Sequence, residues 1–136
     1  MTDCIFCKIA EGKIPCAKIY EDKNAIAFLD ISPVNKGHTL IAPKKHYENL
    51  QAIPEEELCA VMKAVKKIAP AIIRAINAPS FNLIISNGKE AGQEVFHMHV
   101  HIIPQSGDKN TQISLPHNKY KAGEIGKTAE SIKKNL

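Results

Sequence analysis

The chain contains no tryptophan, and phenylalanine and tyrosine together supply only 5% of its 136 residues. It also lacks an apolar run long enough to span a bilayer, and its N-terminus has no basic stretch that leads into an apolar one. These absences argue against a membrane protein and against a secreted protein with a signal peptide. We therefore expect a cytoplasmic protein with no membrane partner.

A strong excess of either charge is missing as well. The 18 Lys and Arg residues exceed the 14 Asp and Glu residues by only four, and the lysines are scattered. This mild charge predicts no dedicated nucleic-acid binding and suits a protein that handles small anions. With 44% hydrophobic residues the chain can bury one core, so we expect a single domain. Residues 1–105 form its core, and residues 106–136 are a lysine-rich extension with a helix over about 123–135.

Cysteine is sparse, and only two of the four cysteines stand in a recognisable spacing, Cys4 and Cys7. In a cytosolic chain a Cys-x-x-Cys pair indicates either half of a zinc site or a redox pair, because structural disulfides are rare there. A zinc site would need two further ligands, which the histidines could supply. Cys16 and Cys59 are expected to behave as small buried hydrophobic residues.

Turn residues and hydrophobic spacing predict the order of the elements. A short helical turn over 8–11 comes first, and five strands are expected over residues 17–21, 25–31, 38–43, 81–86 and 95–104. Apolar residues recur at spacings of three and four after Pro54, which predicts one long amphipathic helix up to Ile76, kinked at Pro70. This order predicts an α+β fold, with an antiparallel five-stranded sheet and one long helix packed on one face.

The densest chemical signal is a run in which His97, His99 and His101 alternate with apolar residues. Side chains on a strand point to opposite faces in turn, so the three imidazoles share one face and the apolar residues fill the other. Histidine has no special preference for strands, and it supplies proton transfer, nucleophilic attack and metal ligation near neutral pH. The run therefore predicts a functional cluster.

This run resembles the signature of the histidine triad family. Three further segments are similar to the branch that contains nucleoside phosphoramidases and small bacterial members, namely residues 28–33, 37–46 and 91–96. The resemblance covers residues 4 to 105 in order. It implies a hydrolase or transferase that acts on nucleotides, and a homodimer whose sheet continues from one copy into the next.

The resemblance also implies a role for each histidine. His99 would be the nucleophile that attacks the α-phosphorus of a purine nucleotide with an AMP moiety, giving a nucleotidyl-histidine that water cleaves. His101 would donate to a phosphate oxygen, and His97 with His38 would support both. A neutral imidazole is a competent nucleophile, so no metal is required for the chemistry.

Nucleotide-binding residues carry over in the same way. Asp30 would accept the ribose hydroxyls, although a carboxylate before Ser32 and Pro33 could also be a simple turn residue. An apolar slot around the base would be formed by Ile5, Phe6, Phe28 and Ile31, which could equally be ordinary core residues. The phosphate end would contain Ser86, Gly92, Gln93, Glu94 and Val95. Glu94 and Ser86 depart from the best-known animal members, which leaves the leaving group open.

Small bacterial members that begin with this cysteine pair bind zinc, and the resemblance implies Cys4, Cys7, His46 and His97 as a closed structural site here. Two alternatives remain open. One is a zinc-dependent hydrolase in which His97 and His99 hold a catalytic metal. The other is a nucleotide-binding adaptor without catalytic activity.

Overall fold

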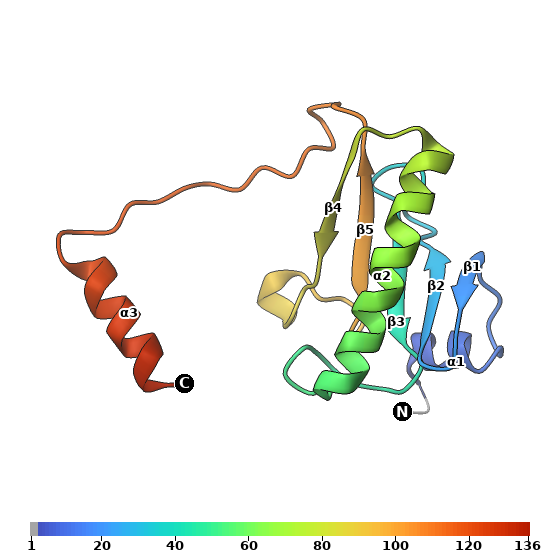
Figure 1. Cartoon of the computed structure of the whole chain (residues 1–136), viewed down its shortest axis with the longest axis horizontal. Coiled ribbons are helices and arrows are strands. Elements are labelled where there is room, and N and C mark those ends of the chain that lie inside the picture. The colour runs from blue at the N-terminus through green and yellow to red at the C-terminus, as the bar shows by residue number, and fades with distance from the viewer. Residues whose placement is uncertain (1–2) are drawn as a thin grey trace.

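The computed structural model describes residues 3–136 and contains a five-stranded antiparallel sheet (Figure 1). Its strand order is β1-β2-β3-β5-β4, and all four pairings are antiparallel. The strands are β1 (Lys18–Glu21), β2 (Ala25–Leu29), β3 (Thr39–Pro43), β4 (Ser80–Ile84) and β5 (Val100–Gln105). The helices are α1 (Ile5–Ala10), α2 (Glu55–Ile76), the 3-10 turn η1 (Lys89–Ala91) and α3 (Glu124–Lys134). The predicted α+β class and the single long helix are confirmed.

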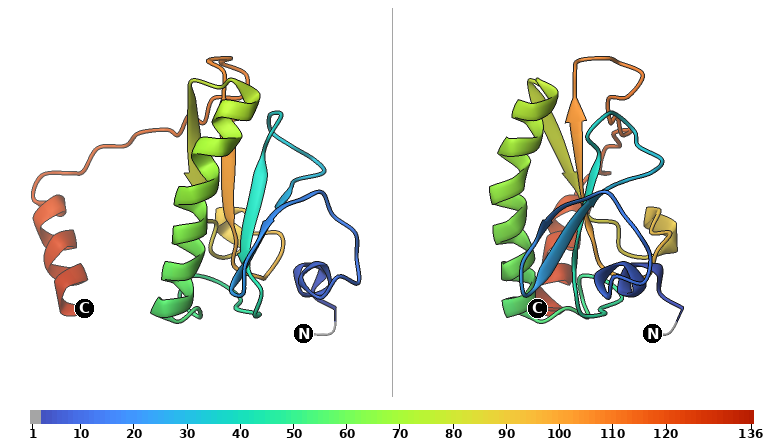
Figure 2. Two further views of the ribbon diagram at one scale, coloured as in Figure 1. Left: turned by 45° about the vertical axis from the view of Figure 1, so that its right-hand side comes forward. Right: turned by 90° about the vertical axis from the view of Figure 1, so that its right-hand side faces the viewer.

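Helix α2 covers one face of the sheet (Figure 2). Three glutamates in its first turn lie at the positive end of the helix dipole, and Asn77 ends it in the left-handed conformation. Its buried stripe packs on the apolar residues that alternate with the histidines, Met98, Val100 and Ile102. The helix continues through Pro70 as one element, so the predicted kink does not divide it.

A second, smaller core lies on the opposite face of the sheet, under α1 (Figure 2). Phe6 and Ile9 of α1 pack against Phe28 and Leu40 on β2 and β3. Cys4 caps this short helix, since its sulfur accepts the Cys7 amide. The central strands β2 and β3 are therefore buried on both faces, with α2 on one side and the N-terminal segment on the other.

Strand β5 is shorter than predicted, because it begins at Val100 instead of residue 95. Its pairing with β3 stops at Ile41 and Val100. Two residues further along β3 stands Pro43, which has no backbone N–H to donate to a neighbouring strand. His97 and His99 thus lie just outside the ladder, and only His101 belongs to the strand.

Other boundaries differ by a few residues. The predicted strand 25–31 ends at Leu29, and the predicted strand 81–86 lies at 80–84. Cys59 is exposed on α2 and Cys16 is half-buried, so the expectation that both are buried was wrong for Cys59. Within residues 3–136 no helix is long and apolar enough to cross a membrane.

Residues 106–136 leave the sheet after β5 as an extended arm that ends in α3 (Figure 1). The predicted last helix is thus present, over 124–134. The arm passes beyond the β4 edge of the sheet and holds α3 away from the rest of the chain. We use the name "arm" below for residues 106–136.

Candidate functional site

A cavity of about 630 Å³ opens on the face of the sheet that α1 covers. Two of the triad histidines, His99 and His101, line it together with His38. One end is apolar, and the histidines and Asp30 lie in its wall. Its lining comes from α1, the segment before β1, the β2–β3 connection and the loop before β5, and comprises Ile5, Phe6, Ile9, Ile14, Pro15, Cys16, Phe28, Leu29, Asp30, Ile31, Ser32, Val34, His38, Leu40, Gly92, Glu94, Val95, His99 and His101.

His99 is held in one orientation by its own backbone neighbour. Its Nδ1 lies 2.6 Å from the carbonyl oxygen of His97, and a carbonyl can only accept a hydrogen bond. The hydrogen-bond pattern therefore assigns the proton to Nδ1 and leaves the Nε2 lone pair free. Burial lowers the pKa of His99 below its usual value, so the ring is neutral at pH 7. A neutral imidazole with a free lone pair beside a cavity is a nucleophile or a base.

His38 and His101 form a second oriented pair. The backbone N–H of Val34 donates to His38 Nδ1 at 3.0 Å, which places the His38 proton on Nε2. That nitrogen donates to His101 Nδ1 at 2.9 Å and lies 3.7 Å from an oxygen of Asp30. His101 consequently carries its proton on Nε2, where it can donate to a bound anion. Burial is the largest cause that lowers the pKa of both rings, to about 4 for His101.

His97 is fully buried and turns away from the cavity lining. Its Nε2 donates to the carbonyl oxygen of Pro43 at 2.7 Å, which leaves the lone pair on Nδ1. This nitrogen lies 3.3 Å from the sulfur of Cys4 and 3.5 Å from that of Cys7. The Cys7 sulfur also lies 3.4 Å from Nδ1 of His46.

These four side chains fit a zinc ion. One ligand atom from each of Cys4, Cys7, His46 and His97 lies within 4.8 Å of all the others. Ligand bonds of about 2.3 Å to sulfur and about 2.1 Å to nitrogen place tetrahedral ligands about 3.6 Å apart, close to the separations here. The Pro43 carbonyl fixes the His97 tautomer in the way that outer partners of metal-bound histidines do. Two thiols and two imidazoles form a closed set, which is typical of structural zinc.

Without a metal the Cys7 thiol is a poor ligand. Burial and the neighbouring Cys4 thiol raise the pKa of Cys7 to about 11, so at pH 7 this thiol keeps its proton. Metal binding would release that proton. Within residues 3–136 no candidate group of metal ligands contains both His97 and His99, whose free lone pairs face different regions.

The expected nucleotide-binding residues fall into two groups. Phe6 is buried and lies edge-on to Phe28 and His99, with ring centroids 5.4 and 5.0 Å away. Ile31 is 98% exposed at the rim of the cavity. Asp30 is both a cavity residue and a turn residue, because its Oδ1 accepts the backbone N–H of Ser32 at 2.8 Å. The turn interpretation and the binding interpretation are thus compatible.

At the other end, Glu94 and Val95 line the cavity beside Gly92, whereas Gln93 and Ser86 are not among the lining residues of the described chain. Gln93 is buried and braces the loop. Its amide nitrogen donates to the carbonyl oxygens of Glu48 and Val95, and its side-chain oxygen accepts the Gly88 N–H.

Several apolar lining residues were not predicted from the sequence, above all the run Ile14, Pro15 and Cys16 before β1. Ile9 on α1 belongs with them. The only signal in the sequence was their position between the cysteine pair and the first strand, which places them near the cavity once α1 packs on the sheet. Nothing in their residue types distinguishes them from core residues.

The chain was compared with protein families and with proteins of known structure. Residues 11–108 match the family model described as the HIT domain. The chain is 41% identical over 106 residues to adenosine 5'-monophosphoramidase hnt1 of Schizosaccharomyces pombe, covering 78% of this chain and 77% of that protein. It is 47% identical over 103 residues to adenylylsulfatase HINT3 of Arabidopsis thaliana, covering 76% of this chain and 52% of that protein.

Solved structures agree with these relatives. A crystal structure of a HIT family member from Bacillus subtilis is 44% identical, covers 98% of this chain and 97% of its own, and superposes with a TM-score of 0.91. A zinc-bound histidine triad family protein from Mycobacterium smegmatis is 32% identical, covers 99% of both chains and superposes with a TM-score of 0.76. With its triad at His97, His99 and His101, this chain belongs to the HIT, or histidine triad, family.

Proposed function

We propose that this protein is a nucleotide hydrolase that cleaves a purine nucleotide conjugate at the α-phosphate, through a covalent nucleotidyl intermediate on His99. The observation that carries this proposal is the orientation of His99. Its Nδ1 is held by the His97 carbonyl at 2.6 Å, and its ring lines the cavity with the other nitrogen free. The names of two relatives, an AMP phosphoramidase and an adenylylsulfatase, support the reaction class.

The reaction takes two displacements. His99 Nε2 attacks the α-phosphorus, a phosphorus–nitrogen bond forms, and the bond to the leaving group breaks with its electron pair. A phosphate or sulfate departs with that pair as an anion, and an amine departs with that pair and takes up a proton from solvent, so that it leaves as a neutral amine. Water then attacks the same phosphorus, the bond to His99 breaks, and AMP is released as the water loses a proton. Covalent catalysis divides one difficult displacement into two easier ones.

The remaining histidines orient and stabilise this reaction. The His99 Nδ1–H donates to the His97 carbonyl, which offsets the positive charge on the ring while Nε2 is bonded to phosphorus. His101 donates its Nε2–H to a non-bridging phosphate oxygen, since His38 occupies its Nδ1. Donors fixed before the reaction stabilise the charge that develops on phosphate.

The apolar end of the cavity fits the base, and its wall fits the ribose. Phe6, Phe28 and Ile5 offer apolar surface to a purine. Asp30 still has one oxygen free of the turn hydrogen bond, which can accept ribose hydroxyls. Glu94 stands at the phosphate end, where a carboxylate would assist an amine leaving group more than an anionic one. Among leaving groups we therefore favour an amine.

We further propose that Cys4, Cys7, His46 and His97 hold a structural zinc ion. The bound ion would supply a cross-link between the N-terminal segment and the triad, and it would not touch the substrate. Its effect on the site passes through His97, whose ring is a ligand and whose carbonyl orients His99. The zinc-bound histidine triad protein from Mycobacterium smegmatis supports a metal in this family.

The enzyme is also proposed to be a homodimer. Strand β4 is an edge of the sheet, so one side of its backbone has no partner strand within the described chain. Leu83 on β4 and Met62 on α2 are both exposed hydrophobic side chains. Pairing of two β4 edges would continue the sheet and cover such residues. Analytical ultracentrifugation at micromolar concentration should give twice the chain mass of 15.0 kDa.

Kinetics with adenosine 5'-phosphoramidate test the catalytic proposal. His99→Ala should lower kcat by on the order of 10⁴-fold or more while the protein still binds AMP. His117→Ala, which changes the histidine of the arm, is the matched control and should keep full activity. A substrate incubation quenched within one turnover should show a mass increase of one AMP moiety on the peptide that contains His99.

Three outcomes distinguish the alternatives. Turnover that His99→Ala leaves intact would contradict the nucleophile. Turnover by the folded protein that disappears with a chelator would favour catalytic zinc. AMP binding without turnover of phosphoramidate, sulfate or polyphosphate substrates would favour the adaptor.

A further inference from the structure

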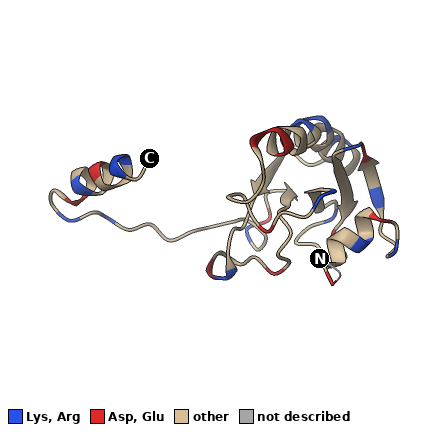
Figure 3. Cartoon of the chain, turned by 90° about the horizontal axis from the view of Figure 1, so that it is seen from below, with Lys and Arg blue, Asp and Glu red and all other residues tan. Residues whose placement is uncertain are grey.

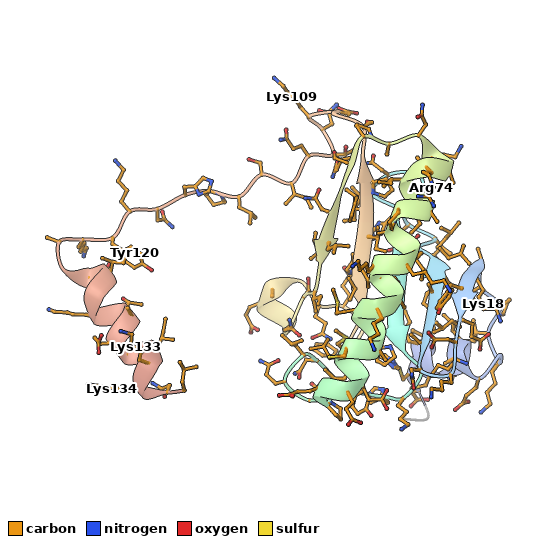
Figure 4. The ribbon with its side chains drawn as sticks, viewed as in Figure 1. Lys18, Arg74, Lys109, Tyr120, Lys133 and Lys134 are labelled. Atoms are coloured by element: carbon orange, nitrogen blue, oxygen red, sulfur yellow. The ribbon has the colours of Figure 1, made fainter. Side chains whose placement is uncertain are left out.

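The arm ends in a helix that has an apolar stripe and nothing to pack against in its own chain. The stripe is formed by Ile125, Ala129 and Ile132 of α3, and Leu136, two residues past the helix, continues the spacing of three and four. Ile125 and Ile132 are about 60% exposed, and none of the α3 residues, all of which the structure describes, is buried. Figure 4 shows their region, with Lys133 and Lys134, standing clear of the sheet.

Such a helix is not stable by itself. It has 11 residues, and isolated helices shorter than about 12–15 residues are marginal in water. It also contains Gly126, and an interior glycine weakens a helix. Lysines and glutamates occupy the sides away from the stripe (Figure 3). We therefore expect such a helix to be stable only when another surface packs against its apolar side.

A groove of about 470 Å³ on the body of the protein offers a matching surface. It runs along α2 beside β1 and is almost entirely apolar. Lys36 and Lys67 are the charged residues among its lining residues in the described chain, and α3 carries two glutamates and three lysines outside its stripe. The groove is lined by Ile19, Tyr20, Leu29, Lys36, Gly37, Lys67, Ile68, Ala71, Ile72, Ala75 and Ile76.

The position of the arm points to a second copy of this chain as the owner of that groove. The arm leaves β5 and passes the β4 edge of the sheet (Figure 1). The groove of the same chain lies near the opposite edge, which is formed by β1. The 18 residues between β5 and α3 can extend by about 3.3 Å each, far enough to cross a neighbouring sheet. A neighbour joined at β4 would present its own groove on the side toward which the arm runs.

The crystal structure of the Bacillus subtilis relative indicates that the arm occupies a fixed position. The arm is 31 of 136 residues, and the Bacillus subtilis structure superposes on 98% of this chain. A superposition of that quality includes the arm. A helix without contacts in its own chain keeps one position in two proteins when a neighbour holds it, and a second copy of the chain is a neighbour that each protein can supply.

We propose that α3 of each protomer docks its apolar stripe into the α2–β1 groove of the partner, so that two arms clasp the dimer. The inference rests on the dimer proposed above. Sedimentation measures that dimer separately, so a dimer with free α3 helices would overturn the clasp alone.

Hydrogen exchange of the full-length protein tests the clasp. The α3 amides should be protected at concentrations where the protein is dimeric and should lose that protection on dilution. Ile132→Asp should abolish the protection, and so should Ala75→Trp, which fills the groove. Two matched controls should keep it: Ser131→Asp adds the same charge off the stripe, and Lys63→Trp adds the same ring elsewhere on α2.

A mixing experiment separates docking in trans from docking in the same chain. Ile132→Asp leaves the groove intact, and Ala75→Trp leaves the helix intact. When the two variants are mixed, the α3 of the Ala75→Trp chains should regain protection in the groove of the Ile132→Asp chains. No recovery on mixing would show docking within one chain. Protection that survives Ala75→Trp would place the helix elsewhere. Either result overturns the proposal.

Discussion

The three triad histidines differ because their hydrogen-bond partners differ. Backbone carbonyls hold the N–H of His97 and His99, whereas His101 accepts from another imidazole. His38 is the residue that decides the His101 tautomer, since its own Nδ1 is occupied by the Val34 N–H. His97 therefore presents the lone pair of Nδ1, His99 presents the lone pair of Nε2, and His101 presents an N–H at Nε2. Alternation on a strand could not have shown this difference.

Replacing His38 should affect turnover more than binding. His38→Ala frees His101 to exchange tautomers, and we expect kcat for the phosphoramidate to fall by about 10- to 100-fold with a smaller change in KM. His38→Gln keeps an N–H near the position of Nε2 and should recover part of the loss. An equal effect of the two variants would show that His38 only fills space.

The half-buried His101 makes the fold sensitive to acid. Its pKa is about 4 in the folded protein and near 6.5 in an unfolded chain. Between these pH values the unfolded chain binds more protons, so the free energy of unfolding should fall as the pH drops from about 6.5 toward 4. Urea unfolding across this range measures the slope. His101→Gln, which cannot titrate, should have a shallower slope, and an unchanged slope would contradict the prediction.

At the scale of elements, the turn that leads into β3 depends on Gly37. Its φ of +89° lies in the left-handed region, and an added Cβ would meet the Ile76 side chain at 2.7 Å. Gly37→Ala should lower the free energy of unfolding by more than the roughly 1–2 kcal/mol of the backbone strain alone. Gly12→Ala isolates that strain, because Gly12 has a φ of +75° and no atom within 4 Å. Chemical denaturation measures the free energy of unfolding of both variants. Equal losses would show that the contact with Ile76 adds nothing to the backbone strain.

The elements also show what the sequence could predict. Strands, helix and sheet class follow from local spacing, because each depends on residues that are near one another in the chain. The start of β5 depends on Pro43, more than fifty residues earlier, which a local pattern cannot register. The exposure of Cys59 could have been predicted, because Cys59 does not lie on the apolar stripe of α2 that includes Leu58, Val61 and Val65.

The residues of the candidate site also fall into two groups, those that the sequence could locate and those that it could not. The triad and the cysteine pair are marked by residue type, so the sequence located them. Ile14, Pro15 and Cys16 line the cavity only because α1 packs against the sheet. Ser86 and Gln93 lie close to the site in sequence, yet the chain's path keeps them out of the cavity lining. Placement of ordinary apolar residues requires the tertiary structure.

At the scale of the whole molecule, the proposed zinc joins distant parts of the chain. A link between Cys4 and His97 closes a loop of 93 residues, for which chain entropy alone corresponds to about 4.7 kcal/mol. Removing the metal should therefore lower the Tm by roughly 10 °C or more. Thermal unfolding with and without chelator, alongside metal analysis, measures this.

Cysteine variants supply the control for the metal. Cys4→Ser should lose stoichiometric zinc and most of the chelator-sensitive part of the Tm. Cys59→Ser changes the exposed thiol of α2 and should retain both. Full zinc content in the Cys4→Ser protein would reject the proposed site.

His97 links the N-terminal cysteines to the nucleophile, and this has a consequence for the newly made chain. Synthesis proceeds from the N-terminus, so Cys4 cannot meet His97 until 93 further residues have been added. The carbonyl that aims His99 belongs to that same late residue. A nascent chain therefore holds no oriented His99 until nearly the whole domain has left the ribosome, and the proposed reaction cannot begin before the fold is complete.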